Sequence, residues 1–369
     1  MVKPSERKIS VHPMQSEIFE VSAVYFLNYE YKKLPLLLNI QYHMSNIQRI
    51  GLMTSGGDSP GMNAAIRAIV RTAIYEGLQP FGIYRGYQGM IEGQIKALQT
   101  TDVSNTIHRG GTILKTARSK EFMTEEGMKK AYDQLKKHDI DALVMIGGDG
   151  TFRGAVEFFK RFDIPAIGLP GTIDNDLNGT DFTIGFDTAV NTAIQAIDKI
   201  RDTADSHDRV FIVEVMGRDA GYIALYSGIA CGAEHIFIPE KAESLDMIID
   251  HIQDDQLRKK LTNIIVVAEG DEFGGAQELS RLLLTKIPGL ETRVTILGHV
   301  QRGGAPTCND RLLSSRLGYA AVQALLAGKK NEMAGLINGE ICFTPFDQCV
   351  KTRKPFPDDM MKIVDVLTK

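Results

Sequence analysis

A short apolar run, a turn rich in glycine and small polar residues, and a segment with helical periodicity follow one another repeatedly in this chain. The order occurs first at residues 50–54, 55–61 and 62–75, and again at 142–146, where a glycine-rich turn leads into 152–159. This alternation is typical of α/β folds with largely parallel sheets. Ligands of such folds bind where strands end and loops lead into helices, so the glycine-rich turns are the first candidates for a functional site.

The same alternation extends along most of the chain. With 369 residues, 43% of them apolar, it predicts a sizeable core arranged as two domains. Further strands are predicted at 81–84, 166–169, 210–215, 236–238, 264–268 and 294–297, and a further helix at 189–200.

Charge and cysteine usage exclude several classes of protein. The 42 basic and 46 acidic residues give a net charge of −4, which provides no general attraction to nucleic acid or to an anionic membrane. The cysteines contain no C-x-x-C pair, which argues against a zinc site or a disulfide framework and favours a reducing cytoplasm. They are Cys231, Cys308, Cys342 and Cys349. No apolar stretch reaches the roughly 18 residues that a membrane-spanning helix needs.

Residues 1–46 form an N-terminal extension in which Lys, Glu, Tyr and Phe are mixed without a sustained period. Glu6, Glu17 and Glu20 argue against a transit peptide, and the positive start is not followed by an apolar region and a small-residue cleavage site. We interpret Met44 as the functional start and the preceding residues as an artefact of start assignment. A loosely attached natural extension is the alternative.

Two glycine-rich turns are candidates for binding phosphate. In TSGGDSPG at 54–61, the missing Cβ atoms let backbone N–H groups approach an anion, although a tight turn without ligand is an equal alternative. It matches neither a Walker A loop nor G-x-G-x-x-G. In IGGDGT at 146–151, Asp149 stands between glycines at a strand end. One carboxylate beside phosphate-binding amides suffices to hold Mg²⁺ on ATP, but an aspartate here also caps helices.

The third turn, LPGTIDND at 169–176, gathers three polar side chains at one strand end. Asp174 and Asp176 are two residues apart, so in an extended segment they point the same way. One can act as a general base toward a substrate hydroxyl while the other holds charge near the metal. A solvated acidic turn is the common alternative for an isolated pair of aspartates, and three such turns in one chain disfavour it.

Together these turns resemble the phosphofructokinase family. Five motifs occur in the family's order and approximate spacing, namely TSGGDSPGMNAA, IGGDGT, PGTIDND, VMGR and LGHVQRGG, which begin at residues 54, 146, 170, 215 and 297. The resemblance runs from about residue 47 to the C-terminus. It implies transfer of the γ-phosphoryl group of Mg-ATP to the 1-hydroxyl of fructose 6-phosphate, giving fructose 1,6-bisphosphate and ADP in glycolysis.

The resemblance also implies roles for single residues. Asp174 is the general base, assisted by Thr172, Asp176 and Arg218, and Asp149 holds the Mg²⁺. The implied ATP-binding residues are Gly57, Arg118, Ser119, Gly148, Asp149, Gly150 and Thr151. The implied sugar-phosphate residues are Thr172, Ile173, Asp174, Arg209, Met216, Gly217, Arg218, Glu269, Arg293, His299, Val300, Gln301 and Arg302. In the family a neighbouring subunit supplies the counterparts of Arg209 and Arg293, so a homotetramer with shared active sites is expected.

Two glycines bear on the phosphoryl donor. Pyrophosphate users of the family generally carry Asp in place of Gly150 and Lys in place of Gly171, so both glycines favour ATP. A carboxylate at position 150 would repel the α-phosphate, and a lysine at 171 would supply the charge that a shorter donor lacks. Diacylglycerol and NAD kinases share the GGDGT element but lack the other motifs.

A regulatory site for ADP or phosphoenolpyruvate is implied between subunits. It would be lined by Arg67, Arg71, Arg201, Gly232, Glu234, Arg258 and Lys260. The match is partial, because Thr100 stands where a further arginine is expected, and Leu261 and Thr262 interrupt the usual basic run. Fewer cations weaken anion binding, so we expect altered or weak allosteric control.

The predicted architecture is two Rossmann-like α/β/α sandwich domains with mostly parallel sheets and the active site in the interdomain cleft. Residues 47–184 and 297–348 are assigned to a larger ATP-binding domain, and 185–296 and 349–369 to a smaller sugar-phosphate-binding domain. Two other functions stay open: a pyrophosphate-dependent phosphofructokinase, and a non-catalytic sugar-phosphate or nucleotide sensor on the same fold. The sensor is disfavoured because Asp149, Asp174 and Asp176 are all present.

Overall fold

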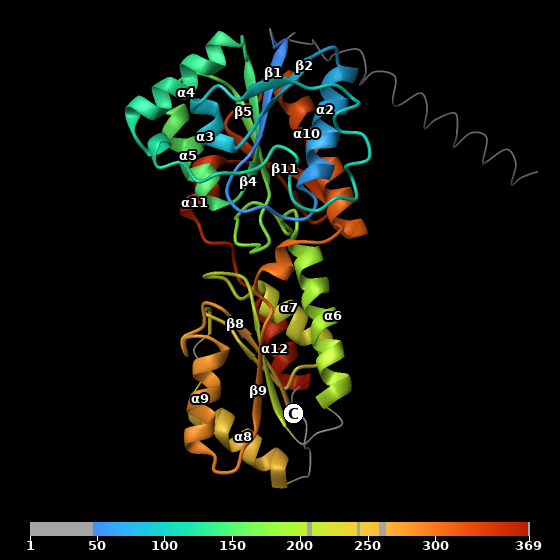
Figure 1. Ribbon diagram of the computed structural model, residues 1–369, viewed down its shortest axis with the longest axis vertical. Coiled ribbons are helices and arrows are strands. Elements are labelled where there is room, and N and C mark those ends of the chain that lie inside the picture. Colours follow the sequence, from blue (N-terminus) through green and yellow to red (C-terminus); the bar gives the residue numbers. More distant parts are fainter. Residues whose placement is uncertain (1–46, 205–208, 242–243, 258–262, 368–369) are drawn as a thin grey trace, which may run out of the picture. The chain divides into compact units, whose positions relative to one another are not determined.

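The computed structural model describes residues 47–204, 209–241, 244–257 and 263–367. Within this part of the chain the strands form two separate sheets, each accompanied by helices (Figure 1). The predicted extension 1–46 lies outside the described residues. Among the helices described, none has both the length and the apolar character needed to cross a membrane.

The first sheet has seven strands in the order β11-β10-β5-β4-β1-β2-β3. Its strands are β1 (Arg49–Thr54), β2 (Gln79–Ile83), β3 (Ile95–Ala97), β4 (Ala142–Gly147), β5 (Ala166–Pro170), β10 (Glu332–Ile337) and β11 (Glu340–Pro345). The neighbours from β10 to β2 run parallel, and β3 and β11 add antiparallel edges. The chain leaves β1 toward β2 on one side, whereas β4 lies on the other, so the sheet has a switch point between β1 and β4.

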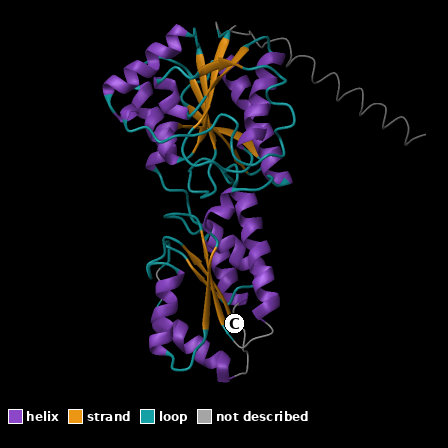
Figure 2. Ribbon diagram, viewed as in Figure 1, coloured by secondary structure: helices purple, strands orange, loops and turns teal. Residues whose placement is uncertain are grey.

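Helices cover both faces of this sheet (Figure 2). One layer contains α2 (Met62–Tyr75) and α10 (Cys308–Leu326). The other contains α3 (Gly86–Ile91), η1 (Glu121–Met123), α4 (Glu125–Lys137), α5 (Asp149–Phe159) and α11 (Phe346–Lys351). Helix α2 buries Ile66, Ile69, Val70 and Ala73, the three- and four-residue spacing of an amphipathic helix. Each layer closes its own hydrophobic core against the sheet.

The second sheet has four parallel strands in the order β7-β8-β6-β9. They are β6 (Val210–Val215), β7 (His235–Phe237), β8 (Asn263–Ala268) and β9 (Thr292–Ile296). All of β8 is buried, as a parallel strand covered on both faces requires. The helices around it are α6 (Phe186–Ala204), α7 (Tyr222–Cys231), α8 (Leu245–Leu257), α9 (Ala276–Lys286) and α12 (Asp358–Leu367), and η2 (Gly298–Arg302) follows β9.

The predicted fold class is confirmed, since the chain is an α/β protein with mostly parallel sheets. The eight predicted strands begin and end within two residues of their expected limits. Helix α2 begins and ends at the residues predicted for it. Strands β3, β10 and β11 were not predicted. β3 has only three residues, and β10 and β11 form an antiparallel hairpin that departs from the strand-helix alternation. The domain limits given above stay a prediction.

A buried carboxylate joins α10, which packs on the first sheet, to α6, which packs on the second. Asp310, 1% exposed, accepts hydrogen bonds from the backbone N–H groups of Gly185 and Thr188, both at 2.8 Å, and from the Thr188 hydroxyl. Burial raises the pKa of Asp310 to about 6, and these donors oppose that shift. A buried acceptor with three donors is satisfied, so it fixes the start of both helices.

Candidate active site

The parallel register places the three glycine-rich turns side by side. Thr54 pairs with Ile146, and Gly147 pairs with Pro170, so β1, β4 and β5 end at the same edge of the sheet. The Ser55 N–H donates to the Ile146 carbonyl at 3.0 Å, and the Gly171 N–H to the Gly147 carbonyl at 2.9 Å. The turns are therefore held to one another by backbone hydrogen bonds before any ligand is considered.

The second sheet presents its own set of polar residues at one edge. The Glu269 N–H donates to the Val215 carbonyl at 2.9 Å, which places the residue after β8 beside the residues after β6. Gln301, fully buried in η2, accepts from the Met216 N–H at 2.8 Å. The segments after β6, β8 and β9 therefore meet at the carboxyl ends of these strands.

Arg302 connects the two edges. Its Nη1 donates to the Asp58 carbonyl in the first glycine turn at 3.2 Å. A Cβ atom added to Gly57 would lie 2.0 Å from the same nitrogen. Gly57 is thus a position where a guanidinium group approaches the backbone so closely that a side chain would displace it.

Asp174 is the buried charge at this junction. It is 9% exposed, and burial raises the pKa of its carboxyl group to about 6. The charges of Asp176 and Glu269 act in the same direction, whereas Arg302 and Arg218 lower it. Groups from both sheets therefore act on one carboxylate, which makes Asp174 a candidate for a catalytic role.

The turn that carries Asp174 and Asp176 is not extended, so the alternation argument that predicted a shared direction for their side chains does not apply to it. Strand β5 ends at Pro170, and Asn175 has a φ of 55°, in the left-handed region. The Asn175 side chain stabilises this turn: its Nδ2 donates to the Asp181 carbonyl at 3.2 Å, and its Oδ1 accepts from the Thr183 N–H at 3.0 Å. Asparagine tolerates this conformation better than most residues.

Arg218 and Glu269 are joined through the backbone. The Arg218 N–H donates to Glu269 Oε1 at 2.8 Å, and Arg218 has a φ of 58°. The guanidinium group is largely exposed, with 74% of the side chain accessible. The turn after β6 is therefore fixed by a carboxylate, while its cationic end stays open to a ligand.

The carboxylates beside the glycine turns suit a divalent cation held mainly by a nucleotide. Asp149, at the start of α5, pairs with Arg153 at 2.6 Å. In the described part of the chain, Oδ1 of Asp176 is buried without a hydrogen-bond partner. Burial raises the pKa of Asp176, and the nearby charge of Asp149 adds to this. No cluster of three or more metal-ligating side chains occurs among the described residues, but Mg²⁺ bound through phosphates needs only one or two carboxylates.

The predicted ATP residues of the second turn lie where close approach is possible. Gly148 faces Thr172, because a Cβ added at position 148 would lie 3.3 Å from the Thr172 Cβ. The Thr151 hydroxyl oxygen, which has no hydrogen-bond partner among the described residues, borders Gly147 and Gly56. A buried hydroxyl of this kind is suited to a ligand that reaches between the turns.

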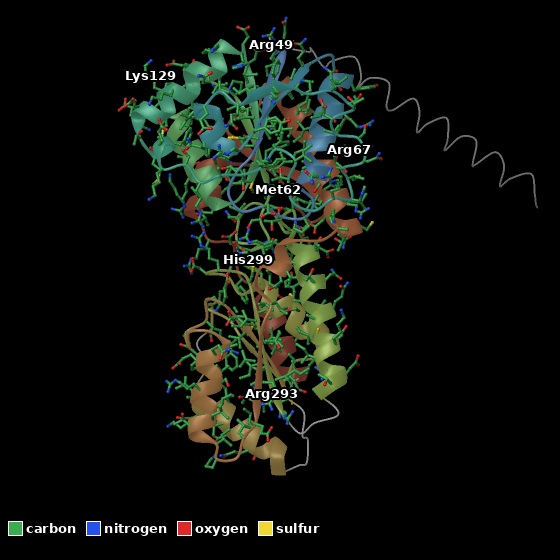
Figure 3. The ribbon with its side chains drawn as sticks, in the orientation of Figure 1. Arg49, Met62, Arg67, Lys129, Arg293 and His299 are labelled. Atoms are coloured by element: carbon green, nitrogen blue, oxygen red, sulfur yellow. The ribbon has the colours of Figure 1, made fainter. Side chains whose placement is uncertain are left out.

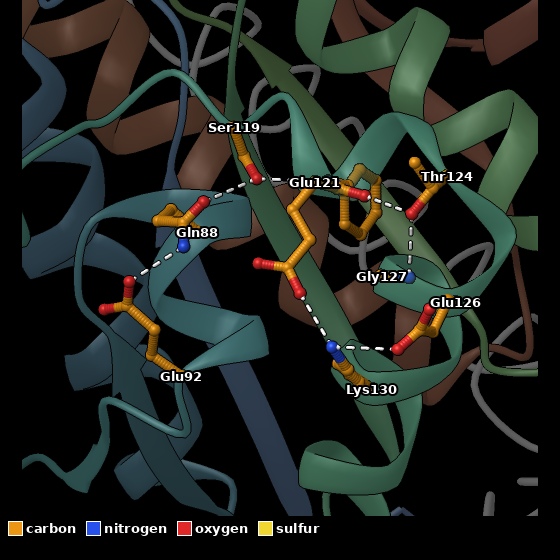
Figure 4. A network of polar contacts seen from close by, with 9 residues as sticks. Gln88, Glu92, Ser119, Glu121, Thr124, Glu126, Gly127 and Lys130 are labelled. Atoms are coloured by element: carbon orange, nitrogen blue, oxygen red, sulfur yellow. Dashed lines mark hydrogen bonds and ion pairs between the residues drawn. The ribbon is translucent and has the colours of Figure 1, made fainter.

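Ser119 and Arg118 lie in the segment that precedes η1. The Ser119 hydroxyl donates to Gln88 Oε1 at 2.7 Å and accepts from the Phe122 N–H at 3.1 Å, in the polar network of Figure 4. Arg118 is exposed. A cavity of about 250 Å³ is lined by Tyr84, Arg85, Gln94, Lys96 and Lys115, so neither Arg118 nor Ser119 lines it.

Comparison with known proteins identifies the family. The family model described as Phosphofructokinase matches residues 49–325. The ATP-dependent 6-phosphofructokinase 2 of Bacteroides thetaiotaomicron is 53% identical over 325 residues, 88% of this chain and 100% of that protein. The ATP-dependent 6-phosphofructokinase 1 of Thermus thermophilus is 54% identical over 321 residues, 87% of this chain and 99% of that protein. This chain belongs to the phosphofructokinase family.

Solved structures agree with this assignment. The phosphofructokinase of Saccharomyces cerevisiae has a TM-score of 0.77 and 38% identity over 87% of this chain. The present chain spans 46% of the length of that yeast chain. A pyrophosphate-dependent phosphofructokinase from Marinobacter aquaeolei has a TM-score of 0.75 at 23% identity, over 87% of this chain and 92% of its own, which shows a shared fold.

Several predicted residues of this phosphofructokinase lie away from Asp174. Arg209 and Arg293 stand at the amino ends of β6 and β9, where both contact Glu291, at 2.7 and 3.6 Å. Figure 3 shows Arg293 and His299 at opposite ends of the β9 region. Within one chain the structure therefore does not bring these two arginines to the carboxylates.

The predicted effector residues are also spread over several elements. Arg67 and Arg71 lie on α2, and Arg67 is labelled in Figure 3. Arg201, in the last turn of α6, contacts Gly232, the residue that follows α7, and Glu234 lies two residues further along. Arg258 and Lys260 lie outside the described residues.

Sequence reasoning missed the surroundings of the Asp174 turn. Asn175 is part of the recognised PGTIDND motif, and its preference for left-handed backbone was the available signal. Lys354 lies near Asp176, but no motif and no local spacing connects residues so far apart in the sequence.

We predict that Asp174→Asn stabilises the folded protein at pH 8 and not at pH 3.5. The folded-state pKa is about 6, above the ordinary value of 3.8, so the ionised carboxylate opposes folding above pH 6. A difference of about two pKa units corresponds to at most about 3 kcal/mol, and we expect a gain of about 1–3 kcal/mol. The gain should disappear as the pH falls through 6 to below 3.8, where both states are protonated.

Urea unfolding of both proteins at a series of pH values measures this difference. Asp163→Asn, at a side chain that is 94% exposed, is the matched control. Its free energy of unfolding should equal that of the wild type at every pH. Equal stabilities of the wild type and Asp174→Asn at pH 8 would show that ionised Asp174 does not strain the fold.

Proposed function

We infer that this phosphofructokinase transfers the γ-phosphoryl group of ATP to the 1-hydroxyl of fructose 6-phosphate, forming fructose 1,6-bisphosphate and ADP as a kinase of glycolysis. One observation carries the inference: Asp174, buried and surrounded by Arg218, Glu269 and Arg302, follows the glycine turns of a chain whose relatives are ATP-dependent 6-phosphofructokinases over nearly their whole length. Thr172 and Asp176 complete the proposed catalytic group.

In the proposed mechanism Asp174 is the general base. It accepts the proton of the sugar 1-hydroxyl as that oxygen forms a bond to the γ-phosphorus, while the bond from phosphorus to the β,γ-bridging oxygen breaks and ADP leaves. A carboxyl group with a pKa of about 6 is a stronger base than an exposed aspartate and is still ionised at neutral pH. Arg218 and Thr172 would lie beside the transferred group and stabilise the negative charge that is spread over its oxygens in the transition state.

The nucleotide would be bound at the glycine turns. The Gly57 N–H, Arg118, Ser119 and the turn 148–151 are the proposed ATP contacts. Asp149, with Asp176 close by, would hold the Mg²⁺ that neutralises phosphate charge during the transfer. Two acidic side chains near each other, one with a buried and unpartnered oxygen among the described residues, support this assignment.

The surroundings of two glycines support ATP as donor rather than pyrophosphate. Apart from its chain neighbours and the backbone of its own helix, no described atom lies within 4 Å of a Cβ added to Gly150, so this position is open to a large donor. A Cβ added to Gly171 would lie 2.8 Å from Ile146 and 3.0 Å from Met62. The lysine typical of pyrophosphate users would therefore not fit at position 171 without repacking the strand ends.

We predict turnover with ATP, little or none with pyrophosphate, and a kcat about 10²–10⁴-fold lower in Asp174→Asn. The KM values for both substrates should change by less than about fivefold, because the amide keeps the size of the side chain. A coupled assay measures each donor in turn, and Asp163→Asn should behave as the wild type. Comparable turnover with pyrophosphate would favour the alternative donor, and no turnover with either would favour the sensor.

We further propose that the sugar 6-phosphate is bound by arginines of two subunits. His299 and Arg302 would contribute from the chain that supplies Asp174, together with Ile173, Met216, Gly217, Glu269, Val300 and Gln301 as lining. Arg209 and Arg293 of a neighbouring copy would supply the remaining cations, since guanidinium groups bind phosphate with good geometry. Their place at the amino ends of β6 and β9 supports this, because the residues proposed around Asp174 lie at the carboxyl ends of these strands. The proposed assembly is a homotetramer.

Mixed oligomers test this arrangement. We predict that Asp174→Asn and Arg293→Ser are each nearly inactive at low fructose 6-phosphate, and that co-refolding the two restores a measurable fraction of wild-type turnover. A mixed interface contains one site with an intact Asp174 from one chain and an intact Arg293 from the other. Each variant refolded with itself is the control. Activity no greater than the average of the two controls would place both residues in the same chain's site.

We propose that control by ADP or phosphoenolpyruvate is weak. The Nη2 group of Arg201 donates hydrogen bonds to the carbonyls of Cys231 and Gly232, at 2.7 and 2.9 Å. The Glu234 carboxylate accepts a hydrogen bond from the Ile264 N–H at 2.8 Å. The Arg201 donors engaged with these carbonyls are not free to bind an anion, and the Glu234 carboxylate is held in place by the backbone. We also propose a cytoplasmic location, which the four unpaired cysteines support.

We predict nearly hyperbolic saturation with fructose 6-phosphate, and a half-saturation point that ADP or phosphoenolpyruvate moves by less than about threefold, a small coupling between sites. Steady-state rates measured at fixed ATP, with and without each effector, provide the test. A strongly sigmoidal curve that ADP makes hyperbolic would show that control is intact.

A further inference from the structure

Lys354 lies between α11 and α12, directly before Pro355 and outside every motif discussed above. Its Nζ donates to the Asp181 carbonyl at 2.6 Å. The Asn175 Nδ2 donates to the same carbonyl oxygen at 3.2 Å. Lys354 and Asn175 therefore share one acceptor, and Asn175 stands between Asp174 and Asp176.

The ammonium group is held in this place from a second side. It lies 5.2 Å from the centre of the Tyr222 ring, a cation–π distance. The Tyr222 hydroxyl donates to the carbonyls of Lys354 and Pro355, both at 3.2 Å, so the same tyrosine fixes the lysine's backbone. Tyr222 begins α7, directly after the turn that carries Arg218. Lys354 thus contacts Asp181, which follows the turn of Asp174, and Tyr222, which follows the turn of Arg218.

The charge of Lys354 also acts on the carboxylate of Asp176. Among the charges that lower the pKa of Asp176, Lys354 follows Arg218. Burial lowers the pKa of Lys354 to about 8, while Asp181 and Asp176 oppose this. At neutral pH most molecules therefore keep the ammonium charge. A half-buried cation beside the carboxylates of Asp176 and Asp181 offsets part of their negative charge.

We propose that Lys354 is a positioning residue for phosphoryl transfer, which holds the turn of Asp174 and Asp176 through the carbonyl that it shares with Asn175. It touches neither substrate, and it acts by fixing the base and the neighbouring carboxylate. This proposal rests on the role given to Asp174 under the proposed function. A positioning residue changes the rate of the chemical step more than it changes binding.

Substitution by methionine tests the proposal, because methionine keeps the length of the side chain and removes the charge and the N–H donors. We expect Lys354→Met to lower kcat about tenfold or more, with the KM values for ATP and fructose 6-phosphate within about threefold of the wild type. Lys354→Arg, which can still donate to the Asp181 carbonyl, should recover most of the lost rate. Arg353→Gln, at the exposed neighbouring cation, is the matched control and should leave kcat unchanged.

Tyr222→Phe distinguishes the effect of the Lys354 charge from the effect of anchoring the backbone of Lys354 and Pro355. It removes the hydrogen bonds to the Lys354 and Pro355 carbonyls but keeps the ring that faces the ammonium group. We expect a lower melting temperature and a kcat within about twofold of the wild type. A loss of kcat equal to that of Lys354→Met would mean that the segment acts only as a structural tether, and the proposal would be wrong.

A double-mutant cycle with Asp174→Asn distinguishes this proposal from the assignment of the base. If Lys354 acts through Asp174, Lys354→Met should cost less than about twofold in kcat when Asp174 is already Asn. A full tenfold loss in that background would show that Lys354 acts elsewhere and overturn the proposal. If Asp174→Asn alone kept wild-type kcat, the general base would be misassigned, whatever Lys354→Met did in the wild type. If Lys354→Met kept wild-type kcat, only the positioning role would fail.

Discussion

The site depends first on the hydrogen-bond register of three neighbouring parallel strands. Because β1, β4 and β5 end together, the turns that follow them are fixed side by side by backbone bonds such as Ser55 to Ile146 and Gly171 to Gly147. Parallel strands need helical crossovers, so residues far apart in the sequence reach one edge. Side chains then need to supply only charge and shape, because the backbone already provides the relative positions.

A second constraint is electrostatic. The junction of the two sheets holds acidic groups, Asp174, Asp176 and Glu269, near the cations Arg218, Arg302 and Lys354. Burial makes the ionised forms of Asp174 and Asp176 costly, and the cations offset only part of that cost, so the carboxyl group of Asp174 keeps a raised pKa. The same imbalance that weakens the fold gives the group the basicity that the proposed reaction needs, a trade-off common at active sites.

Much of this could be predicted from the sequence, and the limits have physical causes. The strands flanking the glycine turns are continuous apolar runs, so fold class and turn positions followed from periodicity. Asp149 and Asp174 were selected as candidates because each lies in such a turn. The conformation at Asn175 was missed because an alternation argument assumes an extended backbone, which the φ of 55° contradicts. Lys354 was missed because its partners, Asp181 and Tyr222, are brought to it by tertiary packing alone.

The shared register also limits how the length of this chain can vary. Inserting or deleting one residue within β4 would turn its side chains toward the opposite helical layer and slide its glycine turn past those of β1 and β5. The opposite ends of these strands carry no such restriction, since the loops there meet no other turn of the site. We therefore expect insertions, and the junctions of viable chimaeras with related enzymes, to fall on that far side of the sheet.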